Sequence, residues 1–230
     1  MGTIHSGTGL LLGAALLLGG GAARAVLTDY TAGGVDLVYD ADNGPTGLTW
    51  LANANLADSV DFGVSGIASN GAMSWDVALN WITAMNAANH AGTNGWRLWS
   101  PMNSDGSGPC IGYNCTESEL GHLFYTEGGL SEFQSIIDSA TLKLHFVNMQ
   151  ASVYWSDTEF APNPNYAWGF NTGYGYQNLD SKDNQIFYGW AVRPGRVAAA
   201  PLPATGLLMA LGLLALGATR RGRRATLVVR

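Results

Sequence analysis

Two apolar segments, one at each end, confine the water-soluble fold of this chain to the residues between them. Near the N-terminus, Leu10 to Ala23 carry no charge and lead into Ala23-Arg24-Ala25, which has the small-x-small form of a signal peptidase site. We therefore expect residues 1–25 to be a signal peptide with a short signal helix. Ala23 and Ala25 are the two small residues of the site that signal peptidase recognises and cleaves. The folded body then begins near Val26.

The C-terminal apolar segment lies between a proline-rich turn and a cluster of arginines. Pro201-Leu202-Pro203-Ala204 precedes it and Arg220-Arg221-Gly222-Arg223-Arg224 follows it. Leu, Ala and Gly partition into hydrocarbon, whereas clustered arginines stay on the cytoplasmic side. We expect a transmembrane helix at 205–219 and a basic cytoplasmic tail at 220–230. The uncharged run covers about 14 residues, fewer than the roughly 20 of a permanent span, which favours a transient anchor.

This tail resembles the VPLPA variety of the PEP-type bacterial sorting signals, with Ala200 where the family has Val. The resemblance implies that residues 196–204 are a spacer with the sorting motif, handled by an exosortase-type protease. Leu202-Pro203-Ala204-Thr205-Gly206 also satisfies the Leu-Pro-x-Thr-Gly pattern of sortase substrates, so a sortase-anchored cell-wall protein remains the alternative. Both interpretations place the protein in the cell envelope or on the outer surface, anchored to the membrane at least transiently.

The body between the two ends is acidic and rich in aromatic residues. All 17 Asp and Glu lie between Val26 and Ala204, with only five of the Lys and Arg, a net charge of −12. Such a charge repels nucleic acid and anionic polymers and favours divalent cations or neutral glycans as partners. All eight Trp, nine Tyr and seven Phe lie in the same region, ample material for the core of one domain.

Local patterns predict an α+β fold with two helices packed on short antiparallel strands. A helix is expected after Ser74, because Trp75, Ala78, Leu79, Ile82 and Met85 recur at helical spacing. A second helix is expected at Thr116, where Thr116-x-x-Glu119 has capping-box form, with Leu120, Leu123 and Phe124 on its buried side. Short strands are expected at 35–39, 48–51, 153–156, 167–170 and 188–192.

The body resembles the Lcl-type C-terminal domain family, a domain of unknown function considered C-type-lectin-like in fold. The pieces that carry the resemblance are, in chain order, Thr46-Gly47-Leu48-Thr49-Trp50-Leu51, Met73-x-Trp75-x-x-Ala78-x-x-Trp81, Gly95-Trp96-Arg97-Leu98, Glu119-Leu120, Tyr154-Trp155-Ser156-Asp157-Thr158, Ala167-Trp168-x-Phe170 and Trp190-Ala191-Val192-Arg193. The chain departs from the family at Trp99, where a Pro is usual, and at 103–115, which looks like an insertion. The resemblance implies one lectin-like domain over 26–195 whose first and last strands pair. It also implies core positions for Trp96 and Trp190, and an Arg97 that bridges backbone or a carboxylate.

Cys110 and Cys115 enclose only four residues. In an oxidising compartment, two cysteines so close together favour a disulfide that fixes the shape of the loop. Free thiols and half of a metal site are the alternatives.

Ligand-binding residues are expected in the later part of the body. Asn163-Pro164-Asn165 is weakly similar to the loop with which calcium-dependent lectins hold sugars. Calcium is therefore the one cofactor considered. The wider set of candidate ligand-binding residues is Asn163, Asn165, Tyr166, Tyr174, Tyr176, Asp180, Asp183 and Asn184. Tyr174 and Tyr176, two apart, would share one strand face and with Tyr166 form a platform for sugar rings, or else pack on neighbouring strands.

Signals for catalysis are weak. Glu119 and His122, three apart on a helical face, are a candidate metal pair, although a solvated face is the favoured interpretation. His90 is interpreted as a helix-end residue and His145 as a packed one. We expect no catalytic residues, no resident metal and no enzyme. The predicted function is an exported binding or adhesion module, associated with an extracellular glycan or exopolysaccharide; the alternative is a structural matrix protein without a small ligand.

Overall fold

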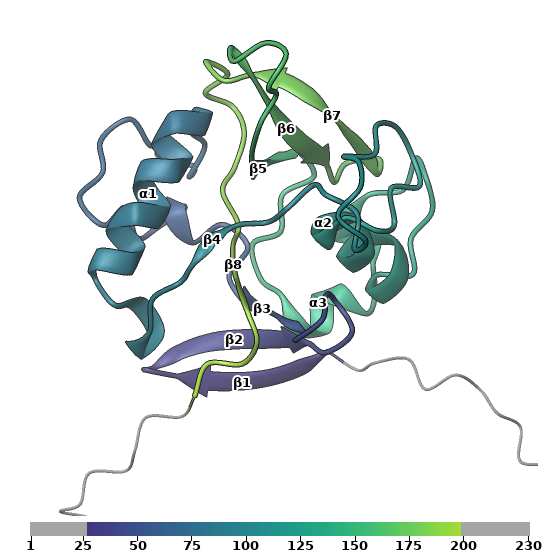
Figure 1. Cartoon of the computed structure of the whole chain (residues 1–230). Helices are drawn as coiled ribbons and strands as arrows, with labels where there is room; N and C mark the ends of the chain where they lie inside the picture. The colour runs from purple at the N-terminus through teal and green to yellow at the C-terminus, as the bar shows by residue number, and fades with distance from the viewer. Residues whose placement is uncertain (1–26, 199–230) are drawn as a thin grey trace, which may run out of the picture.

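The computed structural model describes residues 27–198 (Figure 1). The predicted signal helix, sorting motif, transmembrane helix and basic tail lie outside the described residues. Within residues 27–198, no helix is both long and apolar enough to cross a membrane.

The described chain is an α+β arrangement with two antiparallel sheets. The five-stranded sheet has the order β1-β2-β3-β8-β4, and the three-stranded sheet has the order β5-β6-β7. The strands are β1 (Thr28–Ala32), β2 (Val35–Asp40), β3 (Leu48–Leu51), β4 (Arg97–Leu98), β5 (Val153–Glu159), β6 (Tyr166–Asn171), β7 (Tyr176–Ser181) and β8 (Ala191–Pro194). Figure 1 shows the β1-β2-β3 part at one end of the molecule and β5-β6-β7 at the other.

Helical segments flank the region between the sheets, with α1 on one side and α2 and α3 on the other (Figure 1). The α-helices are α1 (Trp75–Ala87), α2 (Glu119–Gly121) and α3 (Leu142–His145). The other helical turns are the 3-10 segments η1 (Leu56–Asp58), η2 (His90–Gly92) and η4 (Ile136–Asp138), and the π-helical segment η3 (His122–Glu127).

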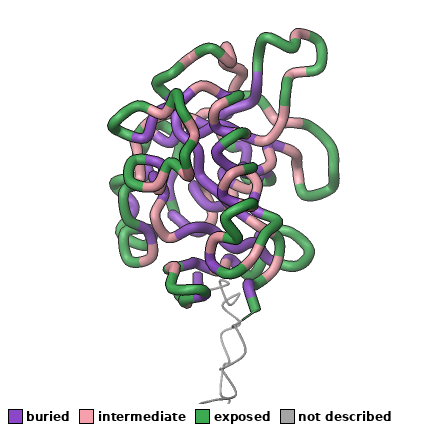
Figure 2. Tube along the Cα trace, turned by 90° about the vertical axis from the view of Figure 1, so that its left-hand side faces the viewer, coloured by how far each residue is buried: buried purple, intermediate pink, exposed green. Residues whose placement is uncertain are grey.

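Buried tryptophans hold the long irregular segments onto the core. Trp190 is fully buried and contacts Trp50 in an edge-on arrangement with ring centroids 5.0 Å apart. Its indole Nε1 donates to the Leu51 carbonyl at 2.9 Å, joining two segments 139 residues apart. Trp155 Nε1 donates likewise to the Met73 carbonyl at 3.0 Å. These rings both fill the core and satisfy loop carbonyls, and Figure 2 shows the buried chain at the centre with exposed loops around it.

Most of the expected elements are present. The strands predicted at 35–39, 48–51, 153–156 and 167–170 are confirmed as β2, β3, β5 and β6. The helix predicted after Ser74 is confirmed as α1, which buries Trp75, Ala78, Trp81, Ile82 and Met85. The core positions of Trp96 and Trp190 are confirmed as well.

Two expectations about the ends of elements are wrong. The second helix begins at Glu119 rather than Thr116, because Ser118 is its N-cap and accepts a hydrogen bond from the Gly121 N–H at 3.2 Å. The last strand begins at Ala191, three residues after Tyr188, which instead forms an isolated parallel bridge to Tyr154.

The last strand pairs with β3 and β4 and not with the first strand. The predicted pairing of first and last strands is therefore wrong, because β1 and β2 form a hairpin at the sheet edge and leave β3 free to accept β8. The two described ends are still close, since the Val197 N–H donates to the Tyr30 hydroxyl at 3.1 Å. The Arg196 guanidinium also lies over the Tyr30 ring, 4.7 Å from its centroid.

Candidate functional site

The predicted ligand residues lie at opposite ends of the β6–β7 hairpin. Tyr174 and Tyr176 are at the turn end, where Tyr176 pairs with Asn171. Tyr166 is at the other end, opposite Ser181. The structure therefore brings Tyr174 and Tyr176 together, with ring centroids 6.2 Å apart, and places Tyr166 elsewhere.

Two rings absent from the predicted set complete a group with Tyr174 and Tyr176. The Tyr113 ring centroid lies 4.7 Å from that of Tyr176 and 6.4 Å from that of Tyr174. The Phe133 centroid lies 4.6 Å from that of Tyr113. Phe133 is 69% exposed and Tyr174 39% exposed, so the group is open to solvent. These four side chains, Tyr113, Phe133, Tyr174 and Tyr176, are called the aromatic platform below.

The disulfide loop holds Tyr113 against the hairpin. The Cys110–Cys115 bond is present, with an S–S distance of 2.02 Å. Gly112, inside the loop, exchanges two backbone hydrogen bonds of 2.9 Å with Gln177 of β7. The buried Gln177 side chain also donates from Nε2 to the Cys110 carbonyl at 2.7 Å. Backbone and side-chain hydrogen bonds to Gln177 thus fix the loop to the sheet edge, while the disulfide closes the loop itself.

Tyr125 connects the disulfide loop to the β6–β7 turn from beneath. The Asn114 N–H donates to the Tyr125 hydroxyl at 2.9 Å, and that hydroxyl donates to the Gly175 carbonyl. Gly175 has φ +80°, and a Cβ there would lie 2.6 Å from the Tyr125 hydroxyl oxygen. The turn therefore requires glycine. The Phe133 N–H donates to the Tyr174 carbonyl at 2.8 Å, so the segments that carry three of the platform rings are tied together.

Polar groups lie beside the aromatic platform. Asn114 Nδ2 donates to Glu132 Oε2 at 3.2 Å on the exposed surface. Partial desolvation raises the pKa of Tyr113, and the nearby Tyr174, Tyr176 and Glu132 raise it further. The Tyr113 hydroxyl is therefore a hydrogen-bond donor at neutral pH. Rings and hydrogen-bonding groups together suit a ligand with an apolar face and hydroxyl edges.

The remaining predicted residues gather at the far end of the hairpin. Asn163 and Asn165 form the β5–β6 turn, and the Lys182 N–H donates to the Asn165 carbonyl at 3.0 Å. This bond brings the turn against the segment that contains Asp183 and Asn184. The structure thus unites the two loops that the sequence analysis paired.

Acidic groups at this end do not form a calcium-like cluster. Asp180 is half-buried, and burial raises the pKa of its carboxyl group. Over residues 27–198, Asp180 and Asp183 belong to no group of three or more carboxylate, His or Cys side chains close enough to hold an ion. The predicted calcium site gains no support here.

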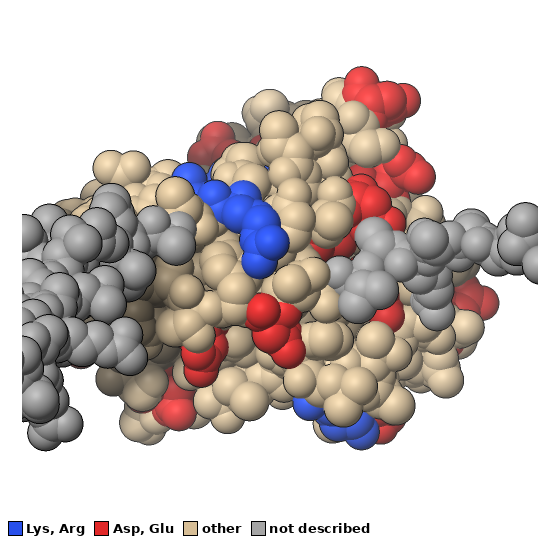
Figure 3. All heavy atoms as spheres, turned by 90° about the horizontal axis from the view of Figure 1, so that it is seen from below, with Lys and Arg blue, Asp and Glu red and all other residues tan. Residues whose placement is uncertain are grey.

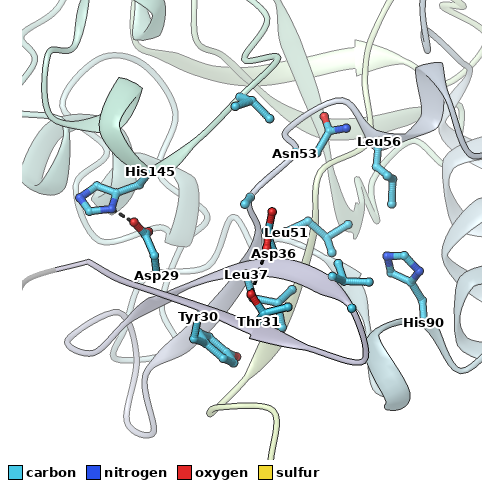
Figure 4. A pocket seen from close by; sticks show the side chains of 14 residues that line it. Asp29, Tyr30, Thr31, Asp36, Leu37, Leu51, Asn53, Leu56, His90 and His145 are labelled. Carbon is cyan, nitrogen blue, oxygen red and sulfur yellow. Dashed lines mark hydrogen bonds and ion pairs between the residues drawn. The ribbon is translucent and has the colours of Figure 1, made fainter. Parts of the chain in front are cut away.

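A separate hollow of about 710 Å³ lies beside β1, β2 and the segment after β3. Its polar groups pair with one another: His145 Nδ1 lies 2.8 Å from Asp29 Oδ1, and Thr31 Oγ1 donates to Asp36 Oδ1 at 3.0 Å (Figure 4). His145 is thus largely buried, with 17% of its side chain exposed, and it also makes a polar contact with Asp29. His90, the first residue of η2, lies across the hollow three residues after the end of α1, and burial lowers its pKa. The polar groups of the hollow are thus engaged with one another, whereas Phe133 and Tyr174 of the aromatic platform are open to solvent.

Glu119 and His122 do not share a ligand site. The Glu119 carboxylate accepts from Arg97 Nη2 at 2.5 Å, Arg97 Nη1 at 2.7 Å and the Ser100 N–H at 2.6 Å. Arg97 therefore bridges a carboxylate, as expected. The His122 imidazole turns instead toward Asp40, with Nε2 3.8 Å from Asp40 Oδ1.

Sequence reasoning found half of the aromatic platform. The expectation that Tyr174 and Tyr176 share a strand face is wrong, because β7 begins at Tyr176 and Tyr174 lies in the turn before it. The two rings meet all the same, whereas Tyr113 and Phe133 lie in irregular segments without periodicity. One signal for Tyr113 exists in the sequence: it lies inside the short Cys110–Cys115 loop, where a disulfide presents a side chain to solvent.

Comparison of the chain with protein-family models, with curated proteins and with solved structures finds no match.

Proposed function

We propose that this chain is an exported cell-envelope protein whose body is a non-catalytic module that binds a neutral glycan on the aromatic platform. The observation that carries the proposal is the platform itself: four rings in mutual contact, open to solvent, on segments fixed by a disulfide and by the Tyr125 hydrogen bonds. A rigid aromatic surface loses little conformational entropy on binding.

The chemistry of the platform favours a sugar over other ligands. The C–H faces of pyranose rings stack on aromatic rings, while their hydroxyl edges need donors and acceptors. Tyr113 supplies a hydroxyl donor, and Asn114 and Glu132 lie beside it. The body's net charge of −12 disfavours anionic polysaccharides. In the view onto the β1 and β2 end, acidic side chains are spread over the face and basic ones gather at few places (Figure 3).

The proposal includes a lectin-like fold of the Lcl type. Its support is the order of the seven motif pieces in the sequence together with an α+β body whose ends meet at Tyr30 and Val197. Export and exosortase-type sorting are proposed on the apolar terminal segments and the Pro201-Leu202-Pro203-Ala204 motif. A sortase remains the alternative protease, and signal peptidase is the partner at the other end.

A structural matrix role without a small ligand is the second candidate. It is favoured by the same exposed aromatic surface, since contiguous apolar patches also mediate association between proteins. The two functions differ in whether a soluble oligosaccharide competes for the surface.

Glycan-array screening of the full-length protein, followed by titration calorimetry with the best neutral oligosaccharide, tests the proposal. Tyr174→Ala should weaken binding about fivefold, because the loss of one stacking ring costs about 1 kcal/mol. Tyr113→Ala should weaken it more, since Tyr113 contacts all three other rings.

Tyr166→Ala is the matched control. Tyr166 is 40% exposed against 39% for Tyr174, and it lies on the same hairpin at the opposite end. Equal losses in the two variants would place binding elsewhere. Absence of any glycan binding, together with self-association that Tyr174→Ala abolishes, would favour the matrix role.

A further inference from the structure

Four side chains from two distant parts of the chain converge near the end of β2. Asp40 ends that strand, and Asp42 lies in the turn that follows. His122 and Glu127 are the first and last residues of η3. Each side chain offers one ligand atom, and these four atoms lie within 4.8 Å of one another.

The π-helical form of η3 makes the convergence of His122 and Glu127 understandable. In an α-helix, side chains five residues apart point about 140° away from each other. A π-helix closes its hydrogen bonds five residues apart and is wound more loosely, which reduces this angle to roughly 50°, and π segments often occur at functional sites. The ends of η3 therefore present an imidazole and a carboxylate toward the same side.

Asp40 is a buried carboxylate aimed into this group with one oxygen free. Its exposed fraction is 1%. Its Oδ2 accepts from Asn43 Nδ2 at 2.9 Å, whereas its Oδ1 has no hydrogen-bond partner. His122 Nε2, 3.8 Å from that oxygen, is also buried without a hydrogen-bond partner. Two facing buried atoms of this kind require compensation, and a cation between them supplies it.

The distances suit a small tetrahedral ion. His122 Nε2 lies 3.4 Å from Asp42 Oδ1, 3.7 Å from Glu127 Oε1 and 3.8 Å from Asp40 Oδ1. Four donors placed about 2.0–2.1 Å from Zn²⁺ lie about 3.3 Å apart. The His122 distances exceed this spacing by a few tenths of an ångström, and all four donor atoms lie within 4.8 Å of one another, so movements of up to about 1.5 Å bring them into one coordination shell.

The donor set separates zinc from calcium and magnesium. Ca²⁺ takes six to eight oxygen ligands and Mg²⁺ keeps an octahedron of oxygens with several waters. Carboxylates alone suit Mg²⁺, Ca²⁺ and Mn²⁺, whereas an imidazole nitrogen suits Zn²⁺ and other first-row transition metals, so His122 is the donor that favours zinc here. Three carboxylates gathered around one imidazole repel one another, and a dication bound between them offsets that repulsion.

We propose that Asp40, Asp42, His122 and Glu127 form a structural Zn²⁺ site that joins the β2–β3 turn to η3. Asn43 already links these parts, since its Nδ2 also donates to the Glu119 carbonyl at 3.0 Å. Because η3 also contains Tyr125, the ion stabilises the segment beneath the aromatic platform. The site itself does not depend on whether the platform binds a glycan.

Calorimetric titration of the untagged full-length protein, stripped with EDTA, tests the site. ZnCl₂ should show one saturable site, with Kd in the micromolar range or tighter. A hundredfold excess over Kd should raise Tm by about 5–10 °C for a domain of this size. Co²⁺ should give the intense visible absorption of a tetrahedral site.

Asp42→Asn is the decisive variant because Asp42 is 47% exposed, and the substitution preserves shape and should not impair folding. It should weaken Zn²⁺ binding at least tenfold, as should His122→Gln. Asp138→Asn, an exposed carboxylate outside the group, and Glu119→Gln should leave binding unchanged. The proposal is overturned if no saturable Zn²⁺ binding occurs, if Asp42→Asn binds as tightly as the wild type, or if Ca²⁺ or Mg²⁺ binds more tightly than Zn²⁺.

Discussion

Replacing both Cys110 and Cys115 by Ala tests how the disulfide loop contributes to stability and binding. The two cysteines are 5 apart in sequence, and closing a loop of about six residues removes chain entropy from the unfolded state worth about 2 kcal/mol. Alanine is the appropriate replacement, because Cys115 is buried and a serine hydroxyl there would need a partner. For a domain of this size the expected fall in Tm is about 4–8 °C.

The native loop keeps other attachments after the disulfide is removed. The two Gly112–Gln177 backbone bonds and the Asn114–Tyr125 bond remain, each worth about 1 kcal/mol. The loop therefore stays in place for most of the time. Glycan affinity should fall by less than in Tyr113→Ala.

Urea unfolding followed by circular dichroism measures the effect, with linear extrapolation to water. Wild type treated with a thiol reductant serves as the control and should match the double variant. A fall in the free energy of unfolding above about 4 kcal/mol would show that the disulfide stabilises parts of the fold outside its own loop. No loss at all, or a glycan affinity reduced as far as in Tyr113→Ala, would refute the view that the hydrogen bonds share in positioning Tyr113.

Three further predictions concern single positions. Burial lowers the folded-state pKa of His90 below its ordinary value of about 6.5, so the unfolded state binds more protons and stability falls as pH drops below about 6.5. Measured by urea unfolding, the loss of stability between pH 7.5 and pH 5.5 should be smaller in His90→Gln than in the wild type, and an identical loss would contradict this. Gly175→Ala should lower the free energy of unfolding by about 1–3 kcal/mol, because φ is +80° and the new Cβ meets Tyr125. A Tm equal to that of the wild type would contradict the close approach of Tyr125 to the β6–β7 turn. Glu119→Ala should cost about 2–3 kcal/mol, because the half-buried Arg97 then keeps only the more distant Asp157, at 4.0 Å, as a carboxylate partner. An Arg97→Met substitution in that background should restore part of the loss if the poorly paired charge is the cause.

The sequence predicted the elements whose burial is periodic. The α1 stripe buries one face of its helix, so its spacing alone indicates it. The short apolar runs of β2 and β3 were predicted as strands from their composition and the turn between them, and β3 is buried at all four positions. The strands β1 and β7 were not predicted, because most of their residues are polar and exposed or half-buried. Such strands form through backbone pairing with a neighbour, which no local pattern records.

Residues of the candidate sites were predicted only where they lie close together in the sequence. Tyr174 and Tyr176 are two apart on the chain, whereas Tyr113 joins them through the fold. His122 was noticed for its spacing from Glu119, yet its imidazole faces Asp40, 82 positions earlier in the printed sequence. The π-helical winding of η3 brings Glu127 to the side of His122. An α-helical period, which is what the sequence predicts there, would place Glu127 on a different face.

Hydrogen–deuterium exchange with and without the best neutral glycan locates the binding surface most directly. Backbone amides at 110–115 and 172–177 should gain protection on binding, because they carry or support Tyr113, Tyr174 and Tyr176. Amides at 163–166 and 180–184, and those around Asp29 and His145, should not change. Protection confined to the far end of the hairpin or to the hollow would contradict the aromatic platform as the binding site.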